Sequence, residues 1–318
     1  MSNGRARAWL VAVVALLASR AWAQANLFPA PDAEGTGERE MQAFAAAYPD
    51  RISGVEIHGG DVPGAIHGGE WALNVDGEWF SWSHGRILPE AQRDDWMKYA
   101  RFRFYPYPLG GLPPLPTLDA DSAARLRKLL EDSRAHPPRR SEAFLERLFR
   151  VGSRAQTLRR IVSVDFLGFH VQVNQRIAGA LRDVATECES LRKSDPQCAA
   201  FLRSLAEVDG FNYRDVAGTL SRSYHGYGLA VDLIPKSYGG KAPYWRWVAE
   251  RNAAAGAAAD WWMTPYEQRW AVPLPLVAAF ERHGFVWGGK WLFFDTMHFE
   301  YRPEILILAR EAEASRSP

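Results

Sequence analysis

The sequence predicts an α+β fold with a β-containing region on its N-terminal side. Two aromatic-rich runs that flank Asp76-Gly77 are typical of a β-hairpin with a two-residue turn. Apolar residues recur at alternating spacings of four and three from Ile177 to Leu191, which is the pattern of an amphipathic helix. Farther along the chain, turns alternate with short apolar segments. This mixture of strand and helix signals is the basis of the α+β prediction.

The first residues have the layout of a secretory signal peptide. Arg5 and Arg7 precede an apolar run over residues 8–18, and the small-residue pattern Ala21-Trp22-Ala23 follows. The apolar run is shorter than the roughly 20 residues that a membrane-spanning helix needs. We expect residues 1–23 to be removed, and the mature chain to be exported to the periplasm or cell envelope without stable membrane insertion. The alternative is an N-terminal anchor that is never cut.

The composition bounds the size of the core and the kind of partner. Apolar residues make up 47% of the 318 residues, enough for a substantial core. The formal net charge of +1 argues against nucleic acid as the main partner, because nucleic-acid-binding proteins usually carry a strong basic excess. The length fits one large domain or two small ones. We divide the mature chain into an N-terminal accessory region, 24–165, and a C-terminal domain, 166–318.

Strands are predicted mainly in the accessory region. Residues 70–75 and 78–82 form the two arms of the hairpin, and a second turn leads into residues 86–88, so that a small meander is expected. Residues 106–116 are rich in proline and glycine and are predicted to be a loop.

Helices are predicted from residue 122 onwards. Asp121 is expected to cap a helix over residues 122–133. A short apolar run near 162–169 predicts a strand. Gly284 is expected at the C′ position of a helix, and Pro303 in the first turn of the last one. The other predicted helices cover residues 141–151, 177–191, 198–207 and 274–283.

The chain has two cysteines, Cys188 and Cys198. In an oxidising compartment they can form a disulfide, although the spacing alone does not fix the geometry that a disulfide requires. A zinc site built on these two residues is not expected, because no second Cys or His pair lies near them.

Two segments carry side chains suited to metal chemistry. Residues 223–232 contain His225 and Asp232, and residues 295–300 contain His298. Catalytic zinc sites use three protein ligands drawn from His and carboxylates and leave one position for water. A further carboxylate nearby can then take a proton from that water, because the metal lowers its pKa to about 7.

The spacing of these residues is awkward for a regular strand. Positions 225 and 232 of a strand face opposite sides, because side chains alternate. Gly226 and Gly228 offer places where a turn or bulge can break that alternation. Asp295 and His298 likewise share a face only on a helical turn or an irregular bend. Spacing alone is therefore a weak signal.

The two segments together resemble a known family. The pattern Ser-x-His-x-x-Gly-x-Ala-x-Asp at 223–232, followed by Asp-x-x-His-Phe-Glu at 295–300, is similar to that of zinc D-alanyl-D-alanine carboxypeptidases and L-alanyl-D-glutamate endopeptidases. These bacterial cell-wall enzymes and phage endolysins share a hedgehog-type peptidase fold. The resemblance covers residues 171–303. It implies a small antiparallel sheet flanked by helices, with peptidoglycan stem peptides as the partner, and makes 166–318 a zinc peptidase domain.

The resemblance also implies roles for individual residues. Zinc is expected on His225, Asp232 and His298, with Asp295 as the general base. Arg214 resembles the arginine that these enzymes place near the scissile carbonyl, where it stabilises an oxyanion or binds a substrate carboxylate. Ser223 matches the motif serine, which supports ligand geometry or substrate.

The second segment departs from part of the family. The carboxypeptidase branch has Glu-x-x-His where this chain has Asp295-x-x-His298, so the resemblance favours an L-Ala-D-Glu endopeptidase. A D-Ala-D-Ala carboxypeptidase and a non-catalytic zinc or cell-wall binding module remain as alternatives. Glu300 is the rival of Asp295 as base, and an arginine ion pair is the alternative partner for Asp232.

Overall fold

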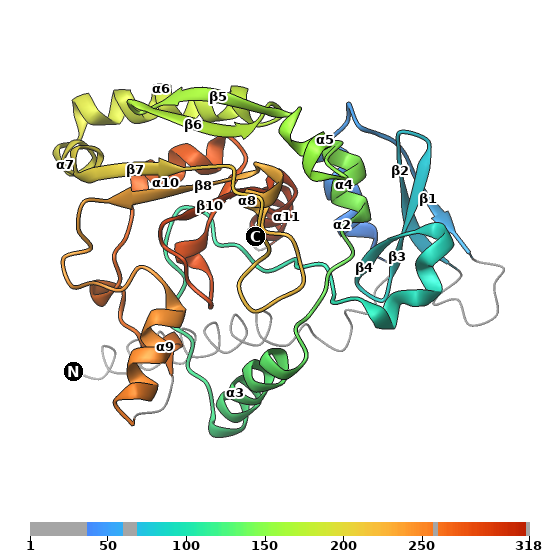
Figure 1. The fold of residues 1–318 in the computed structure, drawn as a ribbon, viewed down its shortest axis with the longest axis horizontal. Coiled ribbons are helices and arrows are strands. Elements are labelled where there is room, and N and C mark those ends of the chain that lie inside the picture. The colour runs from blue at the N-terminus through green and yellow to red at the C-terminus, as the bar shows by residue number, and fades with distance from the viewer. Residues whose placement is uncertain (1–36, 60–68, 257–259, 316–318) are drawn as a thin grey trace, which may run out of the picture.

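The computed structural model describes residues 37–59, 69–256 and 260–315 of the chain. The predicted signal peptide, 1–23, lies outside these residues. The described part mixes helices with small antiparallel sheets, as the α+β prediction requires. Figure 1 places the N-terminal sheet at one end of the molecule and the sheet that contains β7, β8 and β10 at the other.

The N-terminal sheet is a four-stranded antiparallel meander in the order β1-β2-β3-β4. The predicted two-residue turn is confirmed, with Asp76 at φ 50° and Gly77 at φ 84°. Helix α2 packs on this sheet through Met41 and Phe44, which are fully buried. The elements are α2 (Glu38–Ala47), β1 (Ile52–His58), β2 (Glu70–Val75), β3 (Glu78–Ser83) and β4 (Arg86–Pro89).

The stretch that follows connects the two sheets. Its elements are η3 (Glu90–Lys98), α3 (Ala120–Ala135), α4 (Ala143–Phe149) and α5 (Arg154–Leu158). The predicted cap of the first α-helix is wrong by two residues. Asp119, not Asp121, is in an extended conformation, and its carboxylate accepts the amide hydrogen of Ser122 at 2.8 Å. Helix α3 therefore begins at Ala120.

A two-stranded hairpin stands where a single strand was predicted near 162–169. It consists of β5 (Ile161–Phe166) and β6 (Phe169–Asn174). The turn residues Leu167 and Gly168 both have positive φ, 55° and 89°, which is the conformation of a two-residue hairpin turn. The apolar run gave no sign of this turn because only one of the two residues is a glycine. The hairpin spans the boundary that we placed between residues 165 and 166.

The predicted helix over 198–207 is correct only in its first part. Asp195 caps α7 (Pro196–Ser204), and the chain then continues as β7 (Leu205–Asp209). Strand β7 pairs with β8 (Ala230–Pro235), and its Leu205 and Val208 are buried. Sheet pairing therefore outweighs the local helical signal here.

The central sheet has the order β7-β8-β10-β9, with β9 (Phe285–Trp287) and β10 (His298–Tyr301). Helix α10 (Leu274–Arg282) packs on this sheet, and its Phe280 stacks on Phe299 of β10 with ring centroids 3.8 Å apart. Helix α6 (Ala178–Ser194) packs against α10 and β5. Gly284 follows α10 at φ 92°, as expected of a C′ glycine, and α11 (Pro303–Ala314) begins at the predicted proline.

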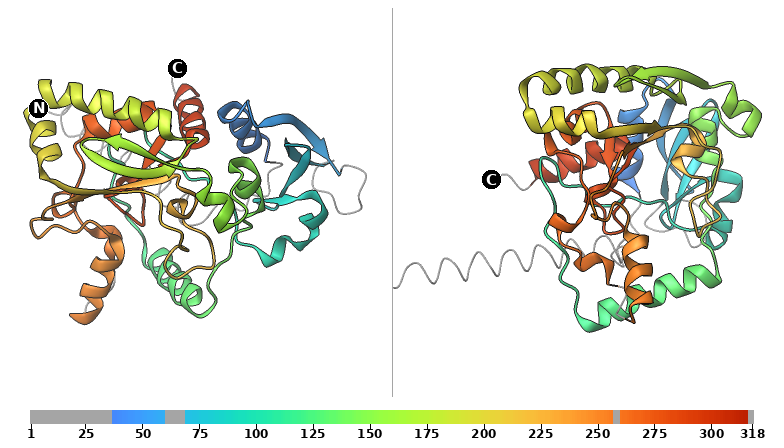
Figure 2. Two further views of the ribbon diagram at one scale, coloured as in Figure 1. Left: turned by 45° about the horizontal axis from the view of Figure 1, so that its top comes forward. Right: turned by 60° about the vertical axis from the view of Figure 1, so that its left-hand side comes forward.

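The segment between β8 and α10 forms a second, smaller core. It contains α9 (Trp245–Ala254), η4 (Trp261–Met263) and η5 (Tyr266–Gln268). Trp261 and Trp262 are buried there against Leu126 of α3. Figures 1 and 2 show α3 and α9 on the same side of the molecule.

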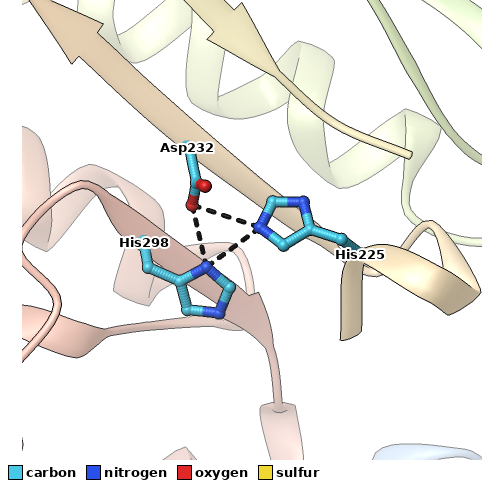
Figure 3. Close-up of side chains that lie close together, drawn as sticks. All are labelled: His225, Asp232 and His298. Carbon is cyan, nitrogen blue, oxygen red and sulfur yellow. Dashed lines mark hydrogen bonds and ion pairs between the residues drawn. The ribbon is translucent and has the colours of Figure 1, made fainter. Parts of the chain in front are cut away.

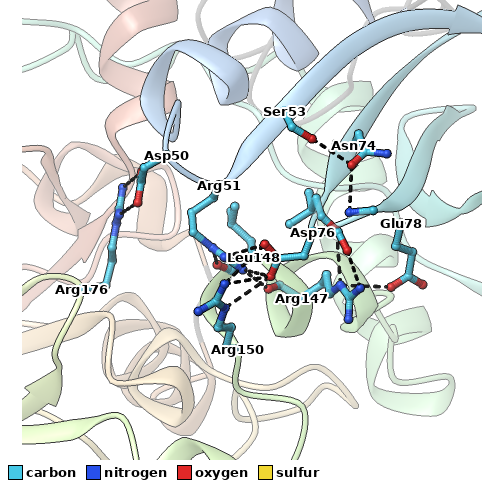
Figure 4. Close-up of polar contacts among 12 residues, drawn as sticks. Asp50, Arg51, Ser53, Asn74, Asp76, Glu78, Arg147, Leu148, Arg150 and Arg176 are labelled. Carbon is cyan, nitrogen blue, oxygen red and sulfur yellow. Dashed lines mark hydrogen bonds and ion pairs between the residues drawn. The ribbon is translucent and has the colours of Figure 1, made fainter.

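Ion pairs connect the N-terminal region to the rest of the chain (Figure 4). Asp76, at the tip of the β2–β3 hairpin, accepts two hydrogen bonds from Arg51, at 2.8 and 2.6 Å, and further ones from Arg150 beyond α4. Asp50 forms a two-pronged pair with Arg176, which precedes α6. The main hydrophobic core also runs through both halves of the chain. The accessory region therefore packs as part of one body with the C-terminal segment.

The two cysteines are free thiols, so the disulfide that their spacing allows is not formed. Both are buried in the main core, where each fills space as a small apolar side chain. Burial raises the pKa of Cys188 to about 12 and that of Cys198 to about 11. Within the described residues, none of the helices combines the length and apolar character needed to span a bilayer.

Candidate metal centre

A single helical turn presents His225. The Ser223 side chain caps α8 (Tyr224–Tyr227) by accepting the His225 amide hydrogen at 3.3 Å. Gly228 ends the turn at φ 72°, and a Cβ at this position would meet the Asn174 amide nitrogen at 2.7 Å. Only glycine fits there, so the chain turns and enters β8 at once. This turn breaks the strand alternation, as the two glycines led us to expect.

Asp232 and His298 lie on neighbouring strands. They are directly opposite each other in the antiparallel pairing of β8 with β10, so their side chains point to the same face. His225 reaches the same point from α8, as Figure 3 shows. His225 Nε2 lies 3.2 Å from Asp232 Oδ1 and 3.1 Å from His298 Nδ1, and His298 Nδ1 lies 2.8 Å from Asp232 Oδ1. The structure thus brings together the three predicted ligands.

The hydrogen bonds behind the two rings fix which nitrogen faces the centre. His225 Nδ1 donates to the Gly210 carbonyl oxygen at 2.5 Å, so that its Nε2 carries the lone pair. His298 Nε2 donates to Glu300 Oε1 at 3.1 Å, so that its Nδ1 carries the lone pair. In the neutral rings, two nitrogen lone pairs and a carboxylate oxygen therefore converge with no proton between them. Such an arrangement calls for a cation, which is either a proton on His298 Nδ1 or a metal ion.

The charges of the site agree with that requirement. Burial by itself disfavours a charged carboxylate, but the electrostatic interaction and the hydrogen bond with His225, followed by those with His298, outweigh burial and hold the pKa of Asp232 far below its ordinary value. Burial also disfavours a charged ring at His298, yet Asp232 and Glu300 hold its pKa well above the ordinary value. The pocket stabilises one positive charge at its centre, either a proton on His298 or a metal ion.

The donor set suits zinc. Two imidazole nitrogens and one carboxylate oxygen are a known catalytic zinc set, and ligands about 2.0–2.1 Å from a tetrahedral ion lie roughly 3.3 Å from one another. The three contacts here, 2.8 to 3.2 Å, are close to that spacing. These three residues would hold zinc with three protein ligands, as catalytic zinc sites do, and would leave one position for water.

Asp295 lies on the bend that leads into β10. Its amide donates to the Gly288 carbonyl at 3.0 Å, and its own carbonyl accepts from the His298 amide at 3.3 Å. Its Oδ1 is buried and has no hydrogen-bond partner among the described residues. Burial raises the pKa of Asp295 to about 6, helped by the charge of Asp232 and opposed by the two histidines. A buried carboxyl group with a raised pKa and one oxygen without a hydrogen-bond partner is suited to accepting a proton.

The other two predicted site residues lie beside α8. The Ser223 hydroxyl is used as the helix cap, so it supports the position of His225. Arg214 is exposed on the preceding loop, where its carbonyl oxygen accepts the Ser223 amide hydrogen at 3.0 Å. The main chain of Arg214 thus lies beside α8, and the residue is exposed.

Sequence reasoning missed several neighbours of the centre. The Gly210 carbonyl orients His225, and main-chain acceptors leave no mark in a motif. Trp291 packs edge-on against His298, with ring centroids 5.6 Å apart. The Tyr238 hydroxyl lies 2.8 Å from Met297 Sδ. Glu300, the rival base, lies behind His298 and is paired with it, on the side of the ring away from the metal-binding nitrogen.

Comparison with family models identifies two segments. Residues 217–301 match a family described as D-alanyl-D-alanine carboxypeptidase. This segment contains the three converging ligands and Asp295, and the match supports a peptidase of this family without distinguishing its branches. Residues 40–104 match a family described as a domain of unknown function. Comparison with curated proteins and with solved structures gave no match.

Proposed function

We propose that the protein is a zinc-dependent peptidase that hydrolyses a peptide bond in the stem peptides of bacterial peptidoglycan. The observation that carries the proposal is the convergence of two imidazole nitrogens and a carboxylate oxygen beside a buried carboxyl group whose Oδ1 has no hydrogen-bond partner among the described residues. The family match over the same residues adds the reaction class. Export to the periplasm or cell envelope is part of the proposal, because the substrate lies there.

His225, Asp232 and His298 would hold the metal. A bound zinc ion supplies a Lewis acid and lowers the pKa of water to about 7. In the proposed reaction Asp295 takes a proton from the attacking water and later gives it to the leaving amine. Arg214 faces the substrate and stabilises negative charge, either on the scissile carbonyl oxygen or on a substrate carboxylate.

The bond that we favour is L-Ala–D-Glu. Asp295 stands where the carboxypeptidase branch has a glutamate, and its aspartate resembles the endopeptidase branch. The second candidate is release of the terminal D-Ala from D-Ala-D-Ala, which the description of the matching family model favours. A non-catalytic zinc or cell-wall binding module is the third, but binding alone gives no reason for a buried carboxyl group with a raised pKa.

One pair of measurements tests the proposal. The zinc content of the purified protein is measured by plasma mass spectrometry, and defined muropeptides are digested and their products weighed. We expect one zinc per chain and two fragments divided between L-Ala and D-Glu. Release of free D-Ala would assign the carboxypeptidase reaction instead. Zinc without any cleavage would favour the binding module, and a chain without zinc and without cleavage would refute the proposal.

A further inference from the structure

The metal centre continues into a buried series of polar side chains that leads from His298 to the N-terminal region. His298 Nε2 donates to Glu300 Oε1 at 3.1 Å, and the other oxygen of Glu300 lies 3.7 Å from Arg302. Arg302 then forms an ion pair with Glu304. The side chains of Arg302 and Glu304 are 4% and 1% exposed. The charges of Arg302 and Glu304 are thus stabilised by neighbouring side chains and not by water.

The far end of this series of polar side chains lies in the N-terminal region. The Tyr48 hydroxyl, at the end of α2, donates to Glu304 Oε2 at 3.3 Å. Arg302 donates to the Arg103 carbonyl oxygen at 3.0 Å, and its guanidinium also lies over the Phe102 ring. These three N-terminal residues all fall within 40–104, the segment that matches a domain of unknown function.

Removing a charged member of this series leaves its buried partner without a counter-charge. A buried ion pair that loses one member is strongly destabilised, because the remaining charge is neither solvated nor neutralised. Arg302 has two carboxylate neighbours and one carbonyl acceptor, so its position depends on Glu304 and on the Arg103 main chain together. Glu300, in turn, has Arg302 and His298 as its partners.

We propose that the N-terminal region supports the metal centre. Through Tyr48 and the Arg103 main chain it holds Arg302 in place. Arg302 in turn holds Glu300, and Glu300 holds the ring of His298 in the orientation that binds metal. Glu300 is a positioning residue in this scheme. The inference rests on the proposed metal site and adds a role for the region 40–104, which does not itself contribute a ligand.

The expected size of the effect follows from the position of Glu300. A carboxylate behind a ligating histidine fixes the tautomer and the orientation of its ring, and its loss typically weakens metal binding about 10- to 100-fold. Glutamine at position 300 keeps an oxygen acceptor for His298 Nε2, so it should restore most of the affinity. The loss of the Tyr48 hydroxyl removes one hydrogen bond at the far end, and we expect a rise in zinc Kd of roughly two- to fivefold.

The test measures zinc affinity of the full chain by competition with a chromogenic chelator. The variants are Glu300→Leu, Glu300→Gln and Tyr48→Phe. The matched control is Tyr266→Phe. The Tyr266 hydroxyl also makes one hydrogen bond, to the Pro113 carbonyl at 2.7 Å, and it does not belong to the series that leads to His298. Circular dichroism of each variant shows that it is folded. If Glu300→Leu does not fold, Tyr48→Phe compared with Tyr266→Phe still decides the role of the N-terminal region.

We expect Glu300→Leu to raise the Kd the most, Glu300→Gln and Tyr48→Phe to raise it less, and Tyr266→Phe to leave it unchanged. A folded Glu300→Leu variant with the wild-type Kd would overturn the positioning role. A Tyr48→Phe variant that binds zinc like Tyr266→Phe would overturn the role of the N-terminal region. A wild-type chain that binds no zinc would refute the proposed function instead, so the two failures are distinguishable.

Discussion

Replacing Asp295 by Asn tests the assignment of the general base. The two side chains have the same shape, and Asp295 Oδ1 accepts no hydrogen bond from the described residues, so the substitution removes the proton acceptor without breaking a contact of that atom. General-base catalysis typically contributes a factor of about 10²–10⁴. At 1.36 kcal/mol per tenfold, that corresponds to roughly 2.7–5.4 kcal/mol of transition-state stabilisation.

The pKa of Asp295 adds a second magnitude. With a pKa of about 6, raised by burial, the carboxyl group is about nine-tenths ionised at pH 7 and about one-tenth ionised at pH 5. A base acts only when ionised, so activity is lost as the pH falls, by about tenfold between these two values. A bound dication would lower this pKa and move the loss to lower pH. The midpoint of the acid limb is therefore expected at or below pH 6.

The assay is the initial rate of muropeptide cleavage, followed by chromatography and mass spectrometry, for wild type, Asp295→Asn and the control Asp183→Asn. Asp183 is exposed on α6, far along the chain from the metal ligands. We expect Asp295→Asn to keep its zinc and to lose kcat, and the control to match wild type. An Asp295→Asn variant with more than a tenth of wild-type kcat would refute the base assignment.

Four further outcomes are expected. Asp232→Asn should lower the zinc content of the purified protein. Removal of zinc from wild type with a chelator should lower the melting temperature, because a ligand at 100 times its Kd stabilises the folded state by about 2.7 kcal/mol. An unchanged melting temperature would contradict a structural contribution of the metal. Asp76→Asn should destabilise the protein by up to about 1 kcal/mol in urea denaturation at pH 7, since the pair with Arg51 is partly exposed. The Arg51 hydrogen bond lowers the pKa of Asp76 from 3.8, so the stabilisation is present above pH 3.8 and is lost as the pH falls through the lowered pKa. The difference in free energy of unfolding between wild type and Asp76→Asn should therefore vanish at low pH. Cys188 and Cys198 should resist a thiol reagent in the native protein and react once it is unfolded; rapid labelling of the native chain would contradict their burial.

The sequence predicted the parts of the fold in which local chemistry is decisive. The Asp76-Gly77 turn requires positive φ at both residues, which Asp tolerates and Gly favours, and the meander follows from it. The amphipathic helix and the helix that begins at Pro303 were likewise predictable from spacing and from a first-turn proline. The β5–β6 hairpin was not, because Leu167 adopts positive φ in its turn and leucine gives no such signal.

For the candidate site, the sequence by itself determined the residue types. His225, Asp232, His298 and Asp295 stand in a two-part motif, and glycine at 228 allows the turn that brings the first ligand round. Only the tertiary structure decided which atoms meet. The register of β8 against β10 sets Asp232 opposite His298, and sheet register depends on contacts between distant segments that no local pattern contains.

The same limit applies to everything behind the ligands. The hydrogen bond from His225 to the Gly210 carbonyl joins two separate segments, and the series from Glu300 through Arg302 to Tyr48 joins residues up to 256 positions apart. Such partners are chosen by burial, since a charge removed from water must find its counterpart wherever the fold puts one. The motif therefore contains the proposed metal ligands, and the packing of the N-terminal region against β10 and α11 places the side chains that we propose hold His298 in position.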